Sequence, residues 1–284
     1  LIPPSILMVL YALLTEVSVG RLFAAGVGPG LTLFVLVSLY IGGRCWLQPD
    51  LGPALPPEER ADWGQKFRSL RAVILPILIV TIVLGAIFGG FATATEAAAI
   101  GVFGALFATG VNRQLSWPVI HEASIATLKL TALIIWILFA AHAFSTAYTA
   151  LGAQSLISDL MAYIPGGRWG ALAFMLMVLF FFGMVLDPVG IMLITLPVFL
   201  PVVQQAGFDP IWFGILFIIM MEVGYMTPPF GFNLFYLKGV APPDVTMGDI
   251  YASVIPYVIV TLIGVLLIIL FPGIALYLPN LFYN

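Results

Sequence analysis

The chain has 284 residues, of which 62% are hydrophobic and only 8% are charged, and its mean hydropathy is +1.14. A soluble domain carries roughly a quarter charged residues, so this composition indicates an all-α polytopic protein embedded in a lipid bilayer. The net charge of −3 comes without a basic cluster, which argues against a nucleic-acid partner. A single cysteine, Cys45, excludes an internal disulfide.

The chain begins at a predicted helix break. The rings of Pro3–Pro4 lack an N–H and clash with the carbonyl four residues back, so 3–14 is interpreted as the second half of a broken helix. Residues 15–25 are predicted to lie at the membrane surface, and 27–43 to cross it. Since Leu1 falls inside this unit, we expect an N-terminal half of the same subunit to precede it.

A polar loop over 44–71, rich in proline and in charges of both signs, leads to a predicted crossing over 72–91. Thr93–Glu96 then fits a capping box, in which a threonine hydroxyl and a glutamate carboxylate satisfy each other's backbone amides. We therefore expect a new helix to start there and to run to about Val111.

The middle of the chain is predicted to hold a loop over 112–129, a crossing over 130–150 and a surface segment over 151–170. His142 interrupts the apolar crossing, and we interpret it as an interior histidine rather than as a proton relay.

Residues 171–201 allow two interpretations. Two apolar stretches flank Gly183–Gly190, and the second is only about a dozen residues long, which is too short to span a bilayer. The segment is either a crossing followed by a short helix, or a re-entrant hairpin over 171–203. Asp187 lies at the tip, either as the cap of a helix that starts at Pro188 or as a functional carboxylate at bilayer depth, and we favour the cap.

A second break is predicted within 211–237, which otherwise has the composition of one crossing. Its middle, Glu222–Asn233, contains two prolines, two glycines, a threonine and an asparagine. A simple proline kink is the alternative. A true break in hydrocarbon is tolerated only where the unpaired backbone groups line a cavity or meet a ligand, as in secondary transporters. Glu222 is interpreted either as an ion or proton ligand or as a contact to a helix or subunit.

The two breaks form an internal repeat, which favours the transporter interpretation over the kink. Both contain a proline pair and, at the same offset, a tyrosine, and a second match follows each after a short insertion. The matching segments are Ile2–Tyr11 with Thr227–Tyr236, and Val17–Phe23 with Val245–Tyr251. A final span over 252–271 follows.

The distribution of Lys and Arg favours the re-entrant hairpin. If 171–203 does not cross, five crossings separate the matched segments, namely 27–43, 72–91, 93–111, 130–150 and 211–237. That odd number makes the repeats inverted, and only Arg21 and Arg168 of the ten Lys and Arg residues fall outside the cytoplasm. A crossing over 171–186 would also move Lys238 outside.

The hairpin tip and the second break are expected to meet near the middle of the bilayer. Together they offer glycine-exposed carbonyls, the Thr227 hydroxyl, the Asn233 amide and two helix N-termini. Oxygen ligands suit a cation such as Na⁺, and helix N-termini favour an anion, so the site is predicted to hold a cation beside a carboxylate. We find no nucleophile–base pair, phosphate loop or metal motif, so we expect neither enzyme activity nor a cofactor.

Five motifs resemble the C-terminal part of the large membrane subunit of TRAP (tripartite ATP-independent periplasmic) transporters, over essentially the whole chain. They are Ile2–Tyr11, Ala24–Gly30, Ala92–Ala99, Gly183–Pro201 and Gly224–Phe235. The resemblance implies an elevator fold of the ion-transporter superfamily in the bacterial inner membrane. It also implies sodium-coupled import of an organic acid, with a small four-helix membrane subunit and a periplasmic substrate-binding protein as partners.

The resemblance further implies site residues. The Na⁺ ligands would be Gly183, Gly224, Thr227 and Phe230, the last through its carbonyl. A second ion site would involve Ile2, Pro3, Pro4 and Ser5. The substrate-binding candidates at the two helix N-termini are Asp187, Pro188, Pro229, Gly231 and Asn233. The run Gly231–Asn233 is bulkier than we expect for the family.

The implied domain division follows the repeat. Residues 1–14 would end the first repeat, 15–150 would be mainly scaffold, 151–240 would form the transport domain, and 241–284 would hold a surface segment and the last scaffold helix. Two alternatives stay open: a dicarboxylate or citrate symporter of the same superfamily that needs no binding protein, and a membrane scaffold that transports nothing.

Overall fold

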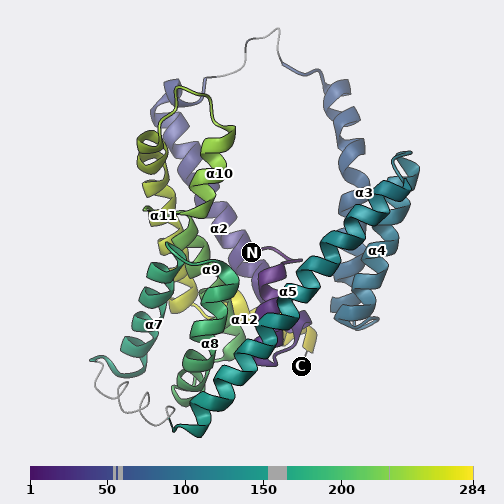
Figure 1. Cartoon of the computed structure of the whole chain (residues 1–284). Coiled ribbons are helices and arrows are strands. Elements are labelled where there is room, and N and C mark those ends of the chain that lie inside the picture. Colours follow the sequence, from purple (N-terminus) through teal and green to yellow (C-terminus); the bar gives the residue numbers. More distant parts are fainter. Residues whose placement is uncertain (54–55, 57–59, 153–164, 230, 284) are drawn as a thin grey trace. The chain divides into compact units, whose positions relative to one another are not determined.

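A computed structural model describes residues 1–53, 56, 60–152, 165–229 and 231–283, and all the regular elements among them are helices (Figure 1). Five of these helices are long and apolar enough to cross a membrane, and a sixth qualifies if a bent pair counts as one span. The predicted all-α polytopic membrane fold is therefore confirmed. The described chain divides into two compact units, residues 1–37 with 133–284, and residues 38–132.

The smaller unit is built around the paired helices α3 (Trp63–Phe88) and α4 (Ala94–Val111). The predicted capping box at the start of α4 is confirmed: the Thr93 hydroxyl accepts from the Glu96 N–H at 3.3 Å, and the Glu96 carboxylate accepts from the Thr93 N–H at 2.8 Å. Gly104 lets α4 approach Ile79 of α3, because a Cβ there would lie 2.9 Å from its Cγ1.

The two polar loops predicted before α3 and after α4 are both shorter than expected. Both ends of the loop predicted over 44–71 are helical, since α2 (Val19–Leu47) extends into it and α3 starts at Trp63 after an Asp62 cap. The 3-10 turn η1 (Pro49–Leu51) lies between these two helices in the chain. The loop over 112–129 is also mostly helical, because α5 (Trp117–Ala150) starts early. Lys, Arg and Gln are good helix formers, so their polarity marks the edge of the apolar span and not the end of the helix.

In the larger unit, α1 (Ile6–Thr15) follows the first proline pair as predicted, but the separate surface segment over 15–25 is wrong beyond Val19. α2 starts there and continues without interruption through Gly26, Gly28 and Pro29. These residues serve close packing: a Cβ on Gly26 would lie 2.9 Å from the Leu1 carbonyl, and one on Gly28 would lie 2.0 Å from the Ile274 carbonyl. The glycines at these positions therefore allow close packing and do not end the helix.

The helices α7 (Gly167–Gly183) and α8 (Pro188–Gln205) pack against each other across the turn 184–187. Their outer ends lie side by side, since the rings of Trp169 and Phe208 are 5.2 Å apart. The prediction that the second stretch is too short to span is wrong: α8 has 18 residues, because it continues through Pro197 and Pro201. Its re-entrant placement in a bilayer stays a prediction.

The centre of the larger unit is α9 (Pro210–Tyr225), which packs against α1, α7, α8 and the later helices α10 (Phe232–Val240), α11 (Met247–Leu270) and α12 (Gly273–Tyr283) (Figure 1). Between Ile211 and Tyr225 every side chain except Glu222 is buried. α9 ends at Tyr225 and α10 begins at Phe232, which confirms the predicted second break.

The internal repeat is visible in the helix caps. Ser18 accepts from the Arg21 N–H at 3.3 Å at the start of α2, and Thr246 accepts from the Asp249 N–H at 3.2 Å at the start of α11. The two pairs occupy matching positions of the repeat. The predicted last span, 252–271, therefore begins earlier, at Met247, and includes 247–251 of the expected surface segment. Inversion of the repeats and the division into transport and scaffold domains stay predictions.

A buried hydrogen bond ties α9 to α11. The Trp212 indole N–H donates to the Ile268 carbonyl at 3.1 Å. That carbonyl would otherwise bond to the amide four residues on, but Pro272 has none. The bond therefore satisfies an acceptor that the helix cannot satisfy itself.

Trp212→Phe is expected to lower the free energy of unfolding by about 1–3 kcal/mol, because it leaves the Ile268 carbonyl buried without a donor. Thermal unfolding of the purified protein in detergent measures the change. Trp136→Phe on the exposed face of α5 is the matched control. An equal, small change in both variants would contradict this role of the indole.

Candidate functional site

The C-terminal ends of α7 and α9 touch backbone to backbone at two buried glycines. A Cβ added to Gly224 would lie 2.5 Å from the Gly183 Cα, and one added to Gly183 would lie 2.9 Å from the Gly224 Cα. No side chain fits between them. The structure therefore brings together the hairpin tip and the second break, as the sequence predicted for these two residues.

Carbonyl groups surround this contact. The Phe180 oxygen lies 3.0 Å from the Cβ position of Gly224, and the Met221 oxygen lies 3.2 Å from that of Gly183. The carbonyls in the last turns of a helix point toward the negative end of the helix dipole, and a carbonyl oxygen that accepts one N–H bond keeps a second lone pair. Two such ends converge here, which makes the contact a favourable place for a cation.

Thr227 lies half-buried directly after α9, with its hydroxyl turned back on the helix. The hydroxyl donates to the Val223 carbonyl at 2.7 Å, and the Thr227 N–H donates to the Gly224 carbonyl at 3.0 Å. These bonds fix the side chain. A hydroxyl that donates one bond keeps its oxygen lone pairs for a cation, so the geometry is compatible with the predicted ligand role.

The rest of the second break is held by backbone and side-chain bonds. The buried Gly231 donates its N–H to the Thr227 carbonyl at 3.3 Å, and the Tyr251 hydroxyl of α11 donates to the Pro229 carbonyl at 3.0 Å. Asn233 is exposed on the first turn of α10. Phe230, whose carbonyl was predicted to bind Na⁺, lies outside the described residues.

The predicted cap at the hairpin tip is confirmed. One Asp187 carboxylate oxygen accepts from the N–H groups of Val189 and Gly190, both at 3.1 Å, and Pro188 is the first helical residue. These two amides at the start of α8 thus already donate to a carboxylate of the chain. At the start of α10, by contrast, Gly231 provides no side-chain cap.

The first break lies beside α9, close to the second. The Leu1 nitrogen is 3.5 Å from the Glu222 carboxylate, and a Cβ on Gly30 of α2 would lie 2.5 Å from the Ile2 side chain. Ser5 is half-buried and makes no capping bond. Glu222 therefore faces the first break from one turn before the second.

Two contacts at the breaks were not expected from the sequence. One is the approach of Glu222 to Leu1, which only the packing of α1 on α9 produces. The other is the Tyr251 hydroxyl on the Pro229 carbonyl. The repeat alignment could have pointed to this hydroxyl, because Tyr251 aligns with Phe23 and the hydroxyl is the one group by which the two side chains differ.

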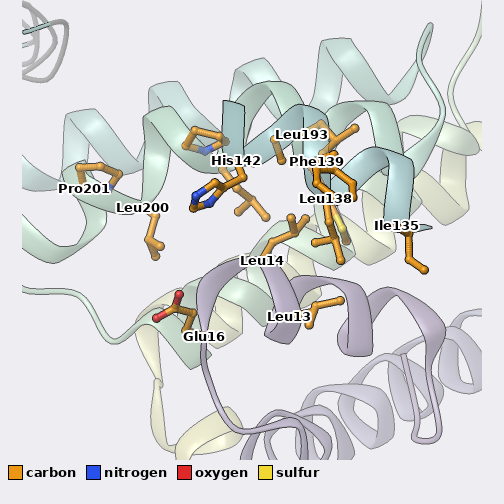
Figure 2. A pocket seen from close by; sticks show the side chains of 14 residues that line it. Leu13, Leu14, Glu16, Ile135, Leu138, Phe139, His142, Leu193, Leu200 and Pro201 are labelled. Carbon is orange, nitrogen blue, oxygen red and sulfur yellow. The ribbon is translucent and has the colours of Figure 1, made fainter. Parts of the chain in front are cut away.

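A separate cavity of about 640 Å³ lies between α1, α5 and α8 (Figure 2). Leucine, proline, isoleucine and phenylalanine side chains form most of its wall, and Glu16 and His142 are the ionisable groups in the lining. His142 is exposed, so its interpretation as an interior histidine is wrong. The predicted site residues that the structure describes lie elsewhere.

Comparison with known proteins shows the family of the chain. A family model described as the DctM component of the tripartite ATP-independent periplasmic transporter matches residues 1–274. The chain belongs to this family. It is similar to a C4-dicarboxylate TRAP transporter large permease protein of Pseudomonas aeruginosa, with 34% identity over 99% of the chain and 64% of the relative.

Other relatives of this TRAP transporter chain differ in the named substrate. An ectoine large permease protein of Halomonas elongata is 31% identical over 100% of the chain and 65% of the relative, and a sialic acid large permease protein of Vibrio cholerae is 29% identical over 99% and 65%. The chain thus spans about two thirds of the length of these permeases. They are transport proteins, and nothing in their names points to enzyme activity.

Proposed function

We propose that the chain forms the C-terminal part of a sodium-coupled secondary transporter subunit that imports an organic acid by an elevator mechanism. The observation that carries the proposal is the convergence of two helix C-termini at Gly183 and Gly224, beside the Thr227 hydroxyl. The relatives named for C4-dicarboxylate and sialic acid support a carboxylate as substrate.

The coupling ion would bind at the glycine contact. Gly183 and Gly224 bring backbone carbonyls together without side chains, and Thr227 adds a neutral oxygen. Neutral oxygens and helix dipoles attract a small cation without burying a fixed negative charge. The Phe230 carbonyl completes the proposed ligand set. Beyond this coupling ion, no cofactor is proposed.

The substrate carboxylate would bind at the start of α10. Asp187 already accepts from the amides at the start of α8, and its negative charge beside Pro188 would repel a second carboxylate there. The first turn of α10 has no side-chain cap and carries the Asn233 amide, with Pro229 and Gly231 next to it. The anion preference of a helix N-terminus is therefore unopposed at α10.

A second ion site is proposed at the first break, Ile2–Ser5. Its support is the packing of this break on α9 beside Glu222. The repeat relates it to the second break.

Membership of the family supports the remaining parts of the proposal. The partners would be a small four-helix membrane subunit, a periplasmic substrate-binding protein and the N-terminal half of the same subunit, in the bacterial inner membrane.

Uptake of a radiolabelled C4-dicarboxylate or sialic acid tests the function. The full-length large subunit, its small subunit and its binding protein are reconstituted in proteoliposomes. We expect uptake only with both an inward Na⁺ gradient and added binding protein. Uptake without the binding protein would favour the two-component symporter, and no uptake by folded protein under any gradient would favour the scaffold.

The re-entrant hairpin predicts that both outer ends of α7 and α8 face the periplasm. Cysteines at Arg168 and Gln204, both exposed, should react with an impermeant maleimide in intact cells once Cys45 is replaced by serine. A cysteine at Gln114, which the charge distribution places inside, should react only after permeabilisation. Labelling of Arg168→Cys and Gln204→Cys from opposite faces would contradict the inverted repeat.

A further inference from the structure

The second break depends on α11 for part of its hydrogen bonding. Pro228 and Pro229 offer no N–H, and the Pro229 carbonyl precedes the first turn of α10. The Tyr251 hydroxyl reaches this carbonyl from the first turns of α11, at 3.0 Å. One backbone oxygen inside the proposed substrate region is therefore oriented by a side chain from another helix.

The start of α11 is itself firmly held. Thr246 and Asp249 form a complete capping box, and the Lys238 ammonium at the end of α10 donates to the Val245 carbonyl at 2.5 Å. Leu234, Ile250 and Val254 form a buried apolar cluster. Met226 and Tyr251 are among the partly buried side chains packed against it. The ring of Tyr251 thus packs on the same apolar cluster as Met226, the first residue of the break.

In the first repeat, α2 contacts the break without a side-chain hydrogen bond of this kind among the residues that the structure describes. There, Gly26 and Gly30 of α2 let the helix touch Leu1 and Ile2 directly. Continuing the repeat alignment places Val254 and Val258 at these two positions in α11, and both valines pack in the apolar cluster. At these positions α11 has valine side chains where α2 has glycines, so the backbone of α11 cannot approach its break as closely as α2 does. A longer side chain is then needed to reach the break. Tyr251 supplies it, where the first repeat has Phe23.

We propose that Tyr251 is a positioning residue for the second break, which orients the Pro229 carbonyl and so sets the affinity of the adjacent site for Na⁺ and substrate. The inference rests on the proposed function for its effect on transport. The positioning itself rests on the hydrogen bond and the apolar cluster.

Tyr251→Phe removes only the hydroxyl and keeps the ring in the cluster. In the reconstituted full complex, we expect the Na⁺ concentration for half-maximal uptake to rise roughly three- to tenfold, because one neutral hydrogen bond to the break is lost. We expect the maximal rate at saturating Na⁺ to stay near that of the wild type. Tyr236→Phe on the exposed face of α10 is the matched control and should leave both values unchanged.

Amide hydrogen exchange of the same proteins in the absence of Na⁺ gives a second readout that does not depend on coupling. The amides of 231–236 should exchange faster in Tyr251→Phe than in Tyr236→Phe. Wild-type uptake that ignores Na⁺ would contradict the proposed function, while faster exchange would still support the positioning role. Sodium-dependent wild-type uptake with an unchanged Na⁺ titration in Tyr251→Phe would overturn the inference alone, as would unchanged exchange.

Discussion

Gly224→Ala is expected to abolish uptake and to destabilise the protein. The new methyl group would lie 2.5 Å from the Gly183 Cα and 2.7 Å from its carbonyl carbon, and these backbone atoms cannot rotate away. Inserting a methyl group into a packed contact costs typically about 1–3 kcal/mol, and a clash with backbone belongs at or above the upper end. The helix ends must then separate, which moves the carbonyls of the proposed ion site apart.

The measurements for Gly224→Ala are uptake per amount of folded protein and the thermal unfolding midpoint. Gly239→Ala in α10 is the matched control, since a Cβ there would meet nothing within 4 Å. We expect the control to keep wild-type uptake and stability. Loss of the folded Gly224→Ala protein agrees with the prediction, whereas wild-type stability and uptake would show that α7 and α9 do not meet at these glycines.

Thr227→Val is expected to raise the Na⁺ concentration for half-maximal uptake. Valine keeps the shape of the side chain but removes the oxygen beside Gly224, and such an interaction is worth about 1–3 kcal/mol, or roughly five- to a hundredfold in affinity. The hydroxyl donates to Val223 in the structure, so its loss also removes one bond within the helix. The fold should be little changed, because that carbonyl still accepts from the Met226 N–H at 3.2 Å.

The control for Thr227 is Thr195 in α8, which is buried and makes the same kind of bond, from its hydroxyl to the Ile191 carbonyl at 2.7 Å. Thr195→Val therefore reports the cost of losing a back-bonded hydroxyl away from the site. A sodium titration that shifts in Thr227→Val but not in Thr195→Val supports the ligand role. Equal titrations in two well-expressed variants would remove Thr227 from the site.

The features that the sequence predicted correctly have local causes. The first proline pair precedes the start of α1 and the second follows the end of α9, because two adjacent prolines remove two N–H donors at once, which single prolines such as Pro197 do not. The caps at Thr93 and Asp187 form because a short side chain reaches amides two or three residues ahead. The same logic predicted α4 to its last turn, and the family motifs lie in these locally determined segments.

The errors share another cause, which is that helix ends depend on packing as well as on residue type. A surface segment over 15–25 was expected to be separate from the next span, but the glycines of α2 let the helix pack on Leu1 and Ile274 without ending. The prolines inside α8 likewise do not end the helix, so the second arm of the hairpin is longer than its most apolar stretch.

Composition, the proline pairs and Asp187 therefore determined an all-helical membrane protein with a helix start after the first proline pair, a break after α9 and a helix cap at the start of α8. The meeting of Gly183 with Gly224 was expected, and only the tertiary structure decided two further contacts, namely Leu1 with Glu222 and the Tyr251 hydroxyl with the Pro229 carbonyl. The physical reason is the range of the forces involved. The hydrogen bonds of helix caps form among near neighbours in the chain, whereas a contact between distant segments forms only once their helices have packed.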